Sequence, residues 1–201
     1  MSRPDPDTIA FYDREAATYA RWTDGKEPPR SFRDFAALLA PGAHVLDLGC
    51  GGGWAARGFR DRGLLVTALD ASAAMVAGLA GEDGIDAIHG GFLDLPPGER
   101  FDAVWACFSL QHAPREDMPA ILAHVAATLK PGGLAWIGVH EGTQTLRDGL
   151  GRHYCHYRQD EMTGLLADAG CAVETVSFAD DKGYDGRPIR VMTLLARKAA
   201  A

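Results

Sequence analysis

A cluster of glycines lies between a short apolar run and a helical pattern, and it is the first feature that could do chemistry. Residues 45–54 read Val-Leu-Asp-Leu-Gly-Cys-Gly-Gly-Gly-Trp. Glycines at such a turn let the backbone bend sharply and let a ligand approach the main chain with no Cβ in the way. In a sheet of parallel strands this turn lies at the carboxyl edge of the first strand, where such folds bind ligands. The cluster therefore predicts a ligand-binding loop.

An acidic residue stands at the end of the next apolar run. Asp70 follows the glycine cluster by about 20 residues, which suits an acid that accepts hydrogen bonds from ribose hydroxyls. A dinucleotide fingerprint, G-x-G-x-x-G, also needs a third glycine for close packing of helix on strand. Gly49 and Gly51 fill the first two places, but Trp54 occupies the third. The bulky indole disfavours a nicotinamide dehydrogenase. Asp70 alone does not separate a dinucleotide from another ligand that contains a ribose.

Two histidines follow later apolar runs at the same expected edge. Each of His112 and His140 could act as a general base, because the pKa of imidazole lies near working pH. For His112 we favour packing beside the bound ligand; for His140 packing and catalysis both stay open. Tyr12 and Tyr19 lie on a predicted N-terminal helix that could fold over the site. Tyr19 is thus a candidate for contact with both the cofactor and the reacting groups.

Residues 147–158 are unusually rich in cationic and aromatic side chains. Arg147, Arg152 and Tyr154 are the predicted substrate contacts, since arginines after the fifth strand could pair with a carboxylate or phosphate. A metal site is the alternative at 153–156, which read His-Tyr-Cys-His. No second ligand pair follows at a recognised spacing, so we predict no metal.

Strands and helices must position these residues, and the sequence indicates them by short apolar runs that alternate with stretches of helical spacing. The expected strands are 43–48, 64–69, 85–88, 103–106, 134–139, 172–178 and 190–196. The expected helices are 54–62, 73–80, 117–129 and 162–169, with helical spacing also before residue 40, interrupted by a loop at 24–29. This alternation predicts an α/β, doubly wound, Rossmann-like and mostly parallel seven-stranded sheet. The last pair of strands should be antiparallel, because no helix separates its members.

Length and charge restrict the organisation and the partners. The chain has 201 residues and a formal net charge of −7, which favours one domain: a helical lid at 1–40 and a core at 41–201. The acidic balance argues against a nucleic-acid partner. We expect no membrane segment, because no run of about 20 apolar residues occurs. Four widely spaced cysteines and an N-terminus without an apolar signal segment suggest the cytoplasm.

Six short segments, in order, resemble motifs of one family. They are 47–53, 69–75, 101–104, 109–112, 129–133 and 161–170. Each segment is a weak signal alone, but the ordered set is similar to the class I S-adenosylmethionine-dependent methyltransferases. The resemblance implies S-adenosylmethionine as cofactor and methyl transfer by direct displacement.

The resemblance also implies roles for particular residues. Gly49 and Gly51 would lie against the methionine part of the cofactor and Asp70 would bind its ribose. The remaining cofactor candidates are Tyr19, Asp47, Cys50 (through its backbone), Ala71, Met75, Gly91, Phe92 and Ala106 (through its carbonyl). The family often has an acid at the position of Gly91, and Asp94 is close by but out of register.

The segment after the fourth strand points to the class of acceptor. Residues 107–110 read Cys-Phe-Ser-Leu and lack the Asn/Asp-Pro-Pro-Tyr type of tetrapeptide. This resembles methyltransferases of small molecules more than those acting on exocyclic amino groups of bases or on glutamine amides. Two alternatives stay open: a cofactor-binding protein without transferase activity, and a methyltransferase of macromolecules. The methylated atom and the oligomeric state are not predicted.

Overall fold

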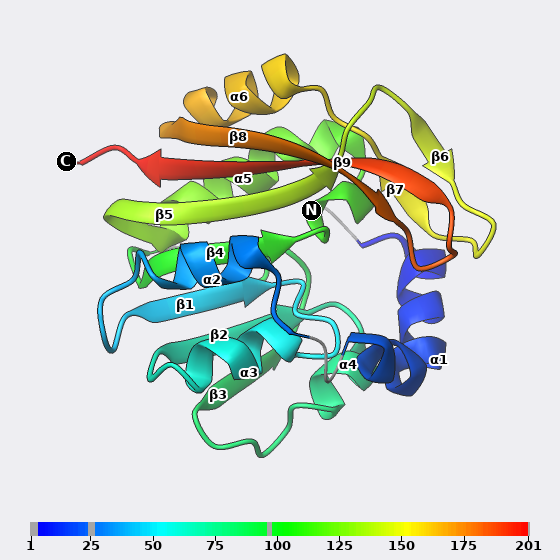
Figure 1. Ribbon diagram of the computed structural model, residues 1–201, viewed down its shortest axis with the longest axis horizontal. Coiled ribbons are helices and arrows are strands. Elements are labelled where there is room, and N and C mark those ends of the chain that lie inside the picture. Colours follow the sequence, from blue (N-terminus) through cyan, green and yellow to red (C-terminus); the bar gives the residue numbers. More distant parts are fainter. Residues whose placement is uncertain (1–3, 24–26, 96–97, 201) are drawn as a thin grey trace.

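The computed structural model describes residues 4–23, 27–95 and 98–200 (Figure 1). The predicted loop at 24–29 lies partly outside these ranges, as does the N-terminal segment on which the expected location rests. No helix in the described part of the chain is long and apolar enough to cross a membrane.

A seven-stranded sheet forms the centre of the molecule, in the order β3-β2-β1-β4-β5-β9-β8. Its strands are β1 (His44–Leu48), β2 (Leu65–Asp70), β3 (Ile85–His89), β4 (Phe101–Cys107), β5 (Leu129–His140), β8 (Cys171–Lys182) and β9 (Pro188–Lys198). The five strands from β3 to β5 pair in parallel, and β9 is antiparallel to both β5 and β8. The predicted fold class is confirmed.

Helices cover both faces of this sheet (Figure 1). The helices of the described chain are α1 (Pro6–Thr23), α2 (Arg30–Ala36), α3 (Trp54–Arg60), α4 (Ala73–Ala77), α5 (Met118–Thr128) and α6 (Gln159–Asp168), with short 3-10 turns η1 (Leu110–His112) and η2 (Arg115–Asp117). Alternate residues of the buried strands serve opposite faces: Val45 packs in the cluster with α2 and α3, whereas Leu46 packs with α5 and α6. Both faces of the parallel strands are therefore buried, which explains their near-continuous apolar runs.

The segment expected to be a loop after β5 instead contains a small antiparallel hairpin. Its strands are β6 (Thr145–Arg147) and β7 (His153–Cys155). The turn between them is held by Asp148, whose Oδ1 accepts hydrogen bonds from the backbone N–H groups of Leu150 and Arg152, each at 2.9 Å. Side-chain bonds of this kind replace backbone bonds in turns. The strands are only three residues long, too short to show a period in the sequence.

Helix α1 lies across the carboxyl edge of the parallel strands and not on a face of the sheet (Figure 1). At one end, Thr8 Oγ1 accepts a hydrogen bond of 2.8 Å from the backbone N–H of His153 in β7. Further along, Asp13 Oδ1 accepts one of 2.6 Å from Ser72 Oγ, the N-cap of α4. The helix is thus attached to both sides of the edge where the predicted site residues gather.

Candidate functional site

The glycine loop is threaded between two neighbours that leave no room for side chains. A Cβ on Gly49 would lie 2.2 Å from the Cβ of Ser109, and one on Gly52 would lie 2.8 Å from the Cα of Ala20 in α1. Gly49 also has a φ of +78°, in the left-handed region that only glycine adopts easily. The cluster therefore permits both the sharp turn after β1 and the close approach of α1.

Asp70 ties the end of β2 to this loop. Its Oδ2 accepts a hydrogen bond of 2.8 Å from the backbone N–H of Gly51, and its Oδ1 accepts one of 2.8 Å from that of Ser72. Burial raises the pKa of Asp70, and these two hydrogen bonds oppose that rise. The carboxylate lines a cavity between the loop and α1, where it is available to further donors.

Asp47 lies beneath the loop and is only 2% exposed. Its Oδ2 has no hydrogen-bond partner among the described residues. Burial, with a smaller contribution from the negative charge of Asp70, raises the pKa of Asp47 to about 7. Most buried carboxylate oxygens in folded proteins have a partner, so this oxygen has acceptor capacity left for a donor or a cation.

The first cavity opens to solvent. Helix α1 forms one wall and the loops after the parallel strands form the other. The sequence-predicted residues that line it are Tyr19, Gly49, Gly51, Asp70, Ala71, Gly91, Phe92 and His112. The structure therefore gathers most of the predicted cofactor contacts around one space.

Four other predicted cofactor residues do not line this cavity: Asp47, Cys50, Met75 and Ala106. The backbone N–H of Cys50 donates to Leu69 O at 3.0 Å, and its carbonyl accepts from Gly53 N at 2.9 Å, so both main-chain groups are occupied. Ala106 is fully buried within β4, and the next two residues, Cys107 and Phe108, form the wall instead.

Asp94 lies next to position 91 but does not line the first cavity. Its Oδ2 accepts a hydrogen bond of 2.6 Å from the backbone N–H of Gly91. The same oxygen lies 3.4 Å from the place where a Cβ of residue 91 would stand. The carboxylate of Asp94 thus reaches the start of the position that the family's acidic side chain would take, from three residues later in the chain.

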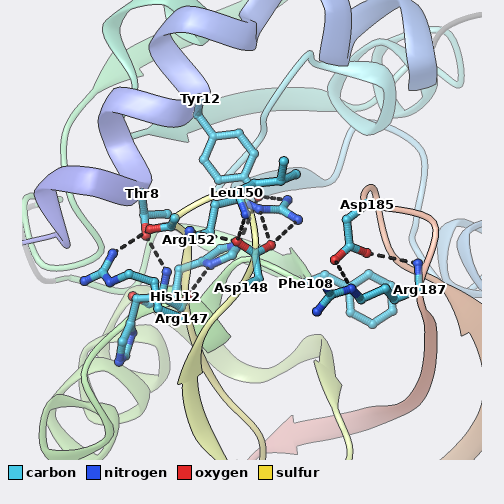
Figure 2. A network of polar contacts seen from close by, with 12 residues as sticks. Thr8, Tyr12, Phe108, His112, Arg147, Asp148, Leu150, Arg152, Asp185 and Arg187 are labelled. Carbon is cyan, nitrogen blue, oxygen red and sulfur yellow. Dashed lines mark hydrogen bonds and ion pairs between the residues drawn. The ribbon is translucent and has the colours of Figure 1, made fainter.

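A buried chain of polar side chains links the β6–β7 hairpin to α1 and to His112 (Figure 2). The guanidinium of Arg152 donates to Asp148 Oδ2 at 2.7 Å and to the Tyr12 hydroxyl at 3.2 Å. The Tyr12 hydroxyl is 3.0 Å from His112 Nε2, and His112 Nδ1 is 2.7 Å from the carbonyl oxygen of His153. Because a carbonyl only accepts, Nδ1 carries the proton and Nε2 accepts from Tyr12.

Both ring nitrogens of His112 are therefore occupied, and burial lowers its pKa to about 4. The imidazole is neutral at working pH and holds Tyr12 in place. His140 differs, because no described residue makes a hydrogen bond to its ring nitrogens. Its ring stacks on Tyr154 with centroids 5.0 Å apart and planes at 8°, and burial lowers its pKa to about 3.

A second cavity adjoins the first. The two share wall residues Tyr12, Tyr19, Cys107, Phe108 and His112. Phe108 has a φ of +56°, a strained conformation for a bulky side chain of the kind that clusters at functional sites. The shared wall means that molecules in the two cavities would meet there.

The predicted substrate residues separate in the structure. Arg152, Tyr154 and His140 line the second cavity, whereas Arg147 lines neither cavity and pairs with Asp5 at 2.8 Å. That ion pair lowers the pKa of Asp5 well below its usual range. Arg147 therefore fastens the start of α1 to the hairpin.

Tyr184 is a wall residue that the sequence patterns missed. It lies in the turn between β8 and β9, and its ring contacts Phe11, Tyr19 and Trp22 of α1 at centroid distances of 6.0, 5.3 and 5.4 Å. A single tyrosine in a turn rich in Gly and Asp carries no periodic signal. Only the long β8–β9 hairpin, which brings the turn across to α1, gives it a role.

Comparison with known proteins agrees with this geometry. A family model for a methyltransferase domain matches residues 45–133, which include the glycine loop and Phe108 in the wall that the two cavities share. A ubiquinone biosynthesis O-methyltransferase of Xanthomonas oryzae pv. oryzae is 30% identical over 196 residues, covering 82% of this chain and 81% of that protein. The chain belongs to the class I S-adenosylmethionine-dependent methyltransferases. The counterpart from Xanthomonas axonopodis pv. citri is 29% identical, with 82% of this chain and 81% of that protein covered.

Solved structures share the fold of this methyltransferase. A Burkholderia thailandensis 1,6-didemethyltoxoflavin-N1-methyltransferase, with bound 1,6-didemethyltoxoflavin and S-adenosylhomocysteine, has a TM-score of 0.73 at 20% identity, covering 99% of this chain and 92% of that one. The [4+2]-cyclase SpnF has a TM-score of 0.77 at 20% identity, covering 100% and 99%. Because proteins with different reactions share this fold, the acceptor must be argued from the cavity.

The residues of this methyltransferase fit its cofactor. The glycine loop leaves a main-chain surface free of Cβ atoms beside the first cavity, and Asp70 offers a carboxylate there. The unpartnered Oδ2 of Asp47 lies under the same loop. These groups suit the methionine and ribose parts of S-adenosylmethionine, the cofactor that the family uses.

Proposed function

We propose that this methyltransferase transfers the methyl group to a small molecule held in the second cavity. The observation that carries the proposal is the roof over that cavity. Helix α1 and the β8–β9 turn meet through Tyr184 and three aromatic residues of α1, and this contact covers one side of the space next to the cofactor cavity. A polymer such as RNA needs an open, basic surface, and this chain carries a net charge of −7.

The cofactor contacts follow from the residues that line the first cavity. We assign Asp70 to the ribose hydroxyls, because its carboxylate keeps acceptor capacity beyond its two backbone donors. Gly49 and Gly51 border the methionine part, and Gly91 and Phe92 border the adenine. Asp47, under the loop, stabilises the positive amino group of the methionine part by its charge.

When bound, S-adenosylmethionine supplies an activated methyl: its carbon–sulfur bond breaks as the acceptor bonds to the carbon, and the electron pair stays on sulfur. The protein mainly aligns the reactants, as displacement requires. His140 is our candidate base, because its ring lines the second cavity and makes no hydrogen bond within the described chain. A neutral imidazole there can accept the proton that an acceptor O–H or N–H loses.

The size of the labelled product tests the small-molecule proposal. The purified enzyme and S-adenosylmethionine carrying a labelled methyl are added to a cell extract that has been separated into fractions below and above a few kilodaltons. We expect label to enter the small-molecule fraction, and not to do so with Asp70→Ala. Transfer only to protein or RNA in the large fraction would contradict the proposal.

A further inference from the structure

The residues that line the second cavity indicate which kind of molecule it binds, and this inference rests on the proposed function. Its aromatic side chains come from distant parts of the chain: Tyr19, Trp22, Trp54, Phe108, Tyr154 and Tyr184. The stacked rings of His140 and Tyr154, with planes at 8°, add an almost flat double surface. Flat aromatic walls favour flat aromatic ligands, through offset stacking and edge-to-face contacts.

The buried cation of this cavity is already neutralised. Arg152 is 3% exposed, and its guanidinium donates through Nε at 3.0 Å and Nη2 at 2.7 Å to the same oxygen of Asp148. Aromatic rings surround it, with centroids of Phe11 and Tyr154 at 4.9 and 5.2 Å from its Cζ. A ligand carboxylate would have to displace Asp148 to pair with Arg152, which would leave a buried carboxylate without its partner.

The other charges around the cavity do not attract an anion either. Glu27, Asp181 and Lys182 line it, all three are exposed, and two of the three are acidic. His112 and His140 are neutral, since burial lowers the pKa of each. The ion pairs of Arg147 with Asp5 and of Arg152 with Asp148 argue against an anionic acceptor bound by these arginines.

Several polar groups around the cavity already bind one another. Gln111 donates to the Phe108 carbonyl at 3.1 Å and accepts from the backbone N–H of His140 at 2.7 Å. Tyr12 and His112 satisfy each other, and Arg152 completes that chain. Among the histidines lining this space, only His140 has ring nitrogens without a partner in the described chain.

We propose that the acceptor is an uncharged, flat aromatic molecule that presents a hydroxyl or N–H group to His140. The proposal rests on the transferase function, and it adds the substrate class and a specificity role for Tyr184. In the transfer, the acceptor's O–H or N–H bond breaks, its proton passes to His140, and the bond to the methyl carbon forms. S-Adenosylhomocysteine and the methylated aromatic are the products.

Three probes of similar size separate the contribution of an aromatic ring to binding from that of a negative charge. Calorimetry compares 2-naphthol, 2-naphthoate and the saturated alcohol decahydro-2-naphthol, each with and without S-adenosylhomocysteine. We expect 2-naphthol to bind at least about tenfold more tightly than either of the others. Tighter binding of the carboxylate or of the saturated alcohol would overturn the proposal, as would no binding of 2-naphthol at millimolar concentration. Failure of S-adenosylhomocysteine to bind would instead overturn the cofactor assignment, and the ranking of the probes would still decide the acceptor class.

Two variants test the residues. Tyr184→Ala should weaken 2-naphthol binding about three- to tenfold without changing the affinity for S-adenosylhomocysteine. Phe178→Ala, an aromatic residue of β8 that is 41% exposed and lies outside the cavity, is the matched control and should change neither. His140→Ala should remove the preference for 2-naphthol over 2-methoxynaphthalene, which cannot donate. An unchanged preference would exclude His140 as the partner.

Discussion

Two buried side chains carry the residue-level chemistry, and each is set by its surroundings. Asp47 is a carboxyl whose pKa burial raises to about 7, and His140 is an imidazole whose pKa burial lowers to about 3. Both shifts favour the neutral form, as desolvation does. A positive charge beside Asp47 would favour its ionised form, whereas the imidazole of His140 stays neutral at working pH.

Asp47 should make the ligand-free protein less stable as pH rises. Its pKa is about 7 in the fold against 3.8 for the ordinary group, so between these values the folded state holds a proton that the unfolded state has lost. Stability therefore falls as pH rises from about 4 to about 7. Asp47→Asn should remove this fall and raise the free energy of unfolding above pH 7 by up to about 4 kcal/mol. Urea unfolding at pH 5 and pH 8 measures it, and equal pH dependence of the two proteins would contradict the buried charge.

His140→Gln should lower kcat by about 10²- to 10⁴-fold if proton transfer limits the reaction, with little change in KM for S-adenosylmethionine. Because the pKa of His140 is about 3, the base stays neutral across pH 5–8, and the wild-type rate should show no step from its titration there. Steady-state kinetics over that range is the measurement. A rate limb near pH 6.5 that disappears in the variant would show an imidazole in an ordinary, solvated environment.

At the scale of elements, the sequence predicted the strands and helices that have a regular pattern of apolar residues, and it missed the features that have no such pattern. Buried parallel strands appear in the sequence as apolar runs such as 43–48 and 134–139. The glycines between β1 and α3 predict the turn that they form. The β6–β7 hairpin depends on one side chain, Asp148, and the wall residue Tyr184 depends on where a long hairpin happens to reach. Such contacts join residues far apart in the chain, so no local period reveals them.

The contact between α1 and the glycine loop leaves no room for a side chain at Gly52, so adding one should displace the helix. Gly52→Ala would place a Cβ 2.8 Å from the backbone Cα of Ala20, which cannot move without the helix. We expect faster hydrogen exchange along α1 and a loss of affinity for S-adenosylhomocysteine of about tenfold, since overpacking costs about 1–3 kcal/mol. Gly164→Ala is the control, because an added Cβ there meets nothing within 4 Å. Equal behaviour of the two variants would show that α1 does not rest on the loop.

At the scale of the whole molecule, α1 closes a site that the sheet alone leaves open. It is fastened by Asp5 to Arg147 of the hairpin and by Asp13 to the N-cap of α4. Lining residues from α1 occur in both cavities, so cofactor and acceptor share one cover. We therefore propose that α1 acts as a lid. The expected lid of residues 1–40 is too long, because α2 packs on a face of the sheet, where Phe32 is fully buried.

Opening of this lid should depend on salt and acid. Arg147→Gln should speed hydrogen exchange of the first turn of α1, and high salt should have the same effect on the wild type, because exposed ion pairs are screened. The pKa of Asp5 is lowered, so the pair's contribution is present above about pH 4 and is lost as pH falls further. Arg30→Gln, which breaks the exposed pair with Asp34 in α2, is the control. No difference between the two variants would place the fastening elsewhere.

Calorimetric titration of the enzyme and of Asp70→Ala with S-adenosylhomocysteine tests the site most directly, because Asp70 joins the glycine loop, β2 and the cofactor cavity. We expect binding in the micromolar range for the wild type and a loss of at least about 30-fold in the variant, as removal of a charged hydrogen-bond acceptor produces. Equal affinity in the two proteins, or no binding by a folded wild type, would contradict the assignment of this cavity to the cofactor.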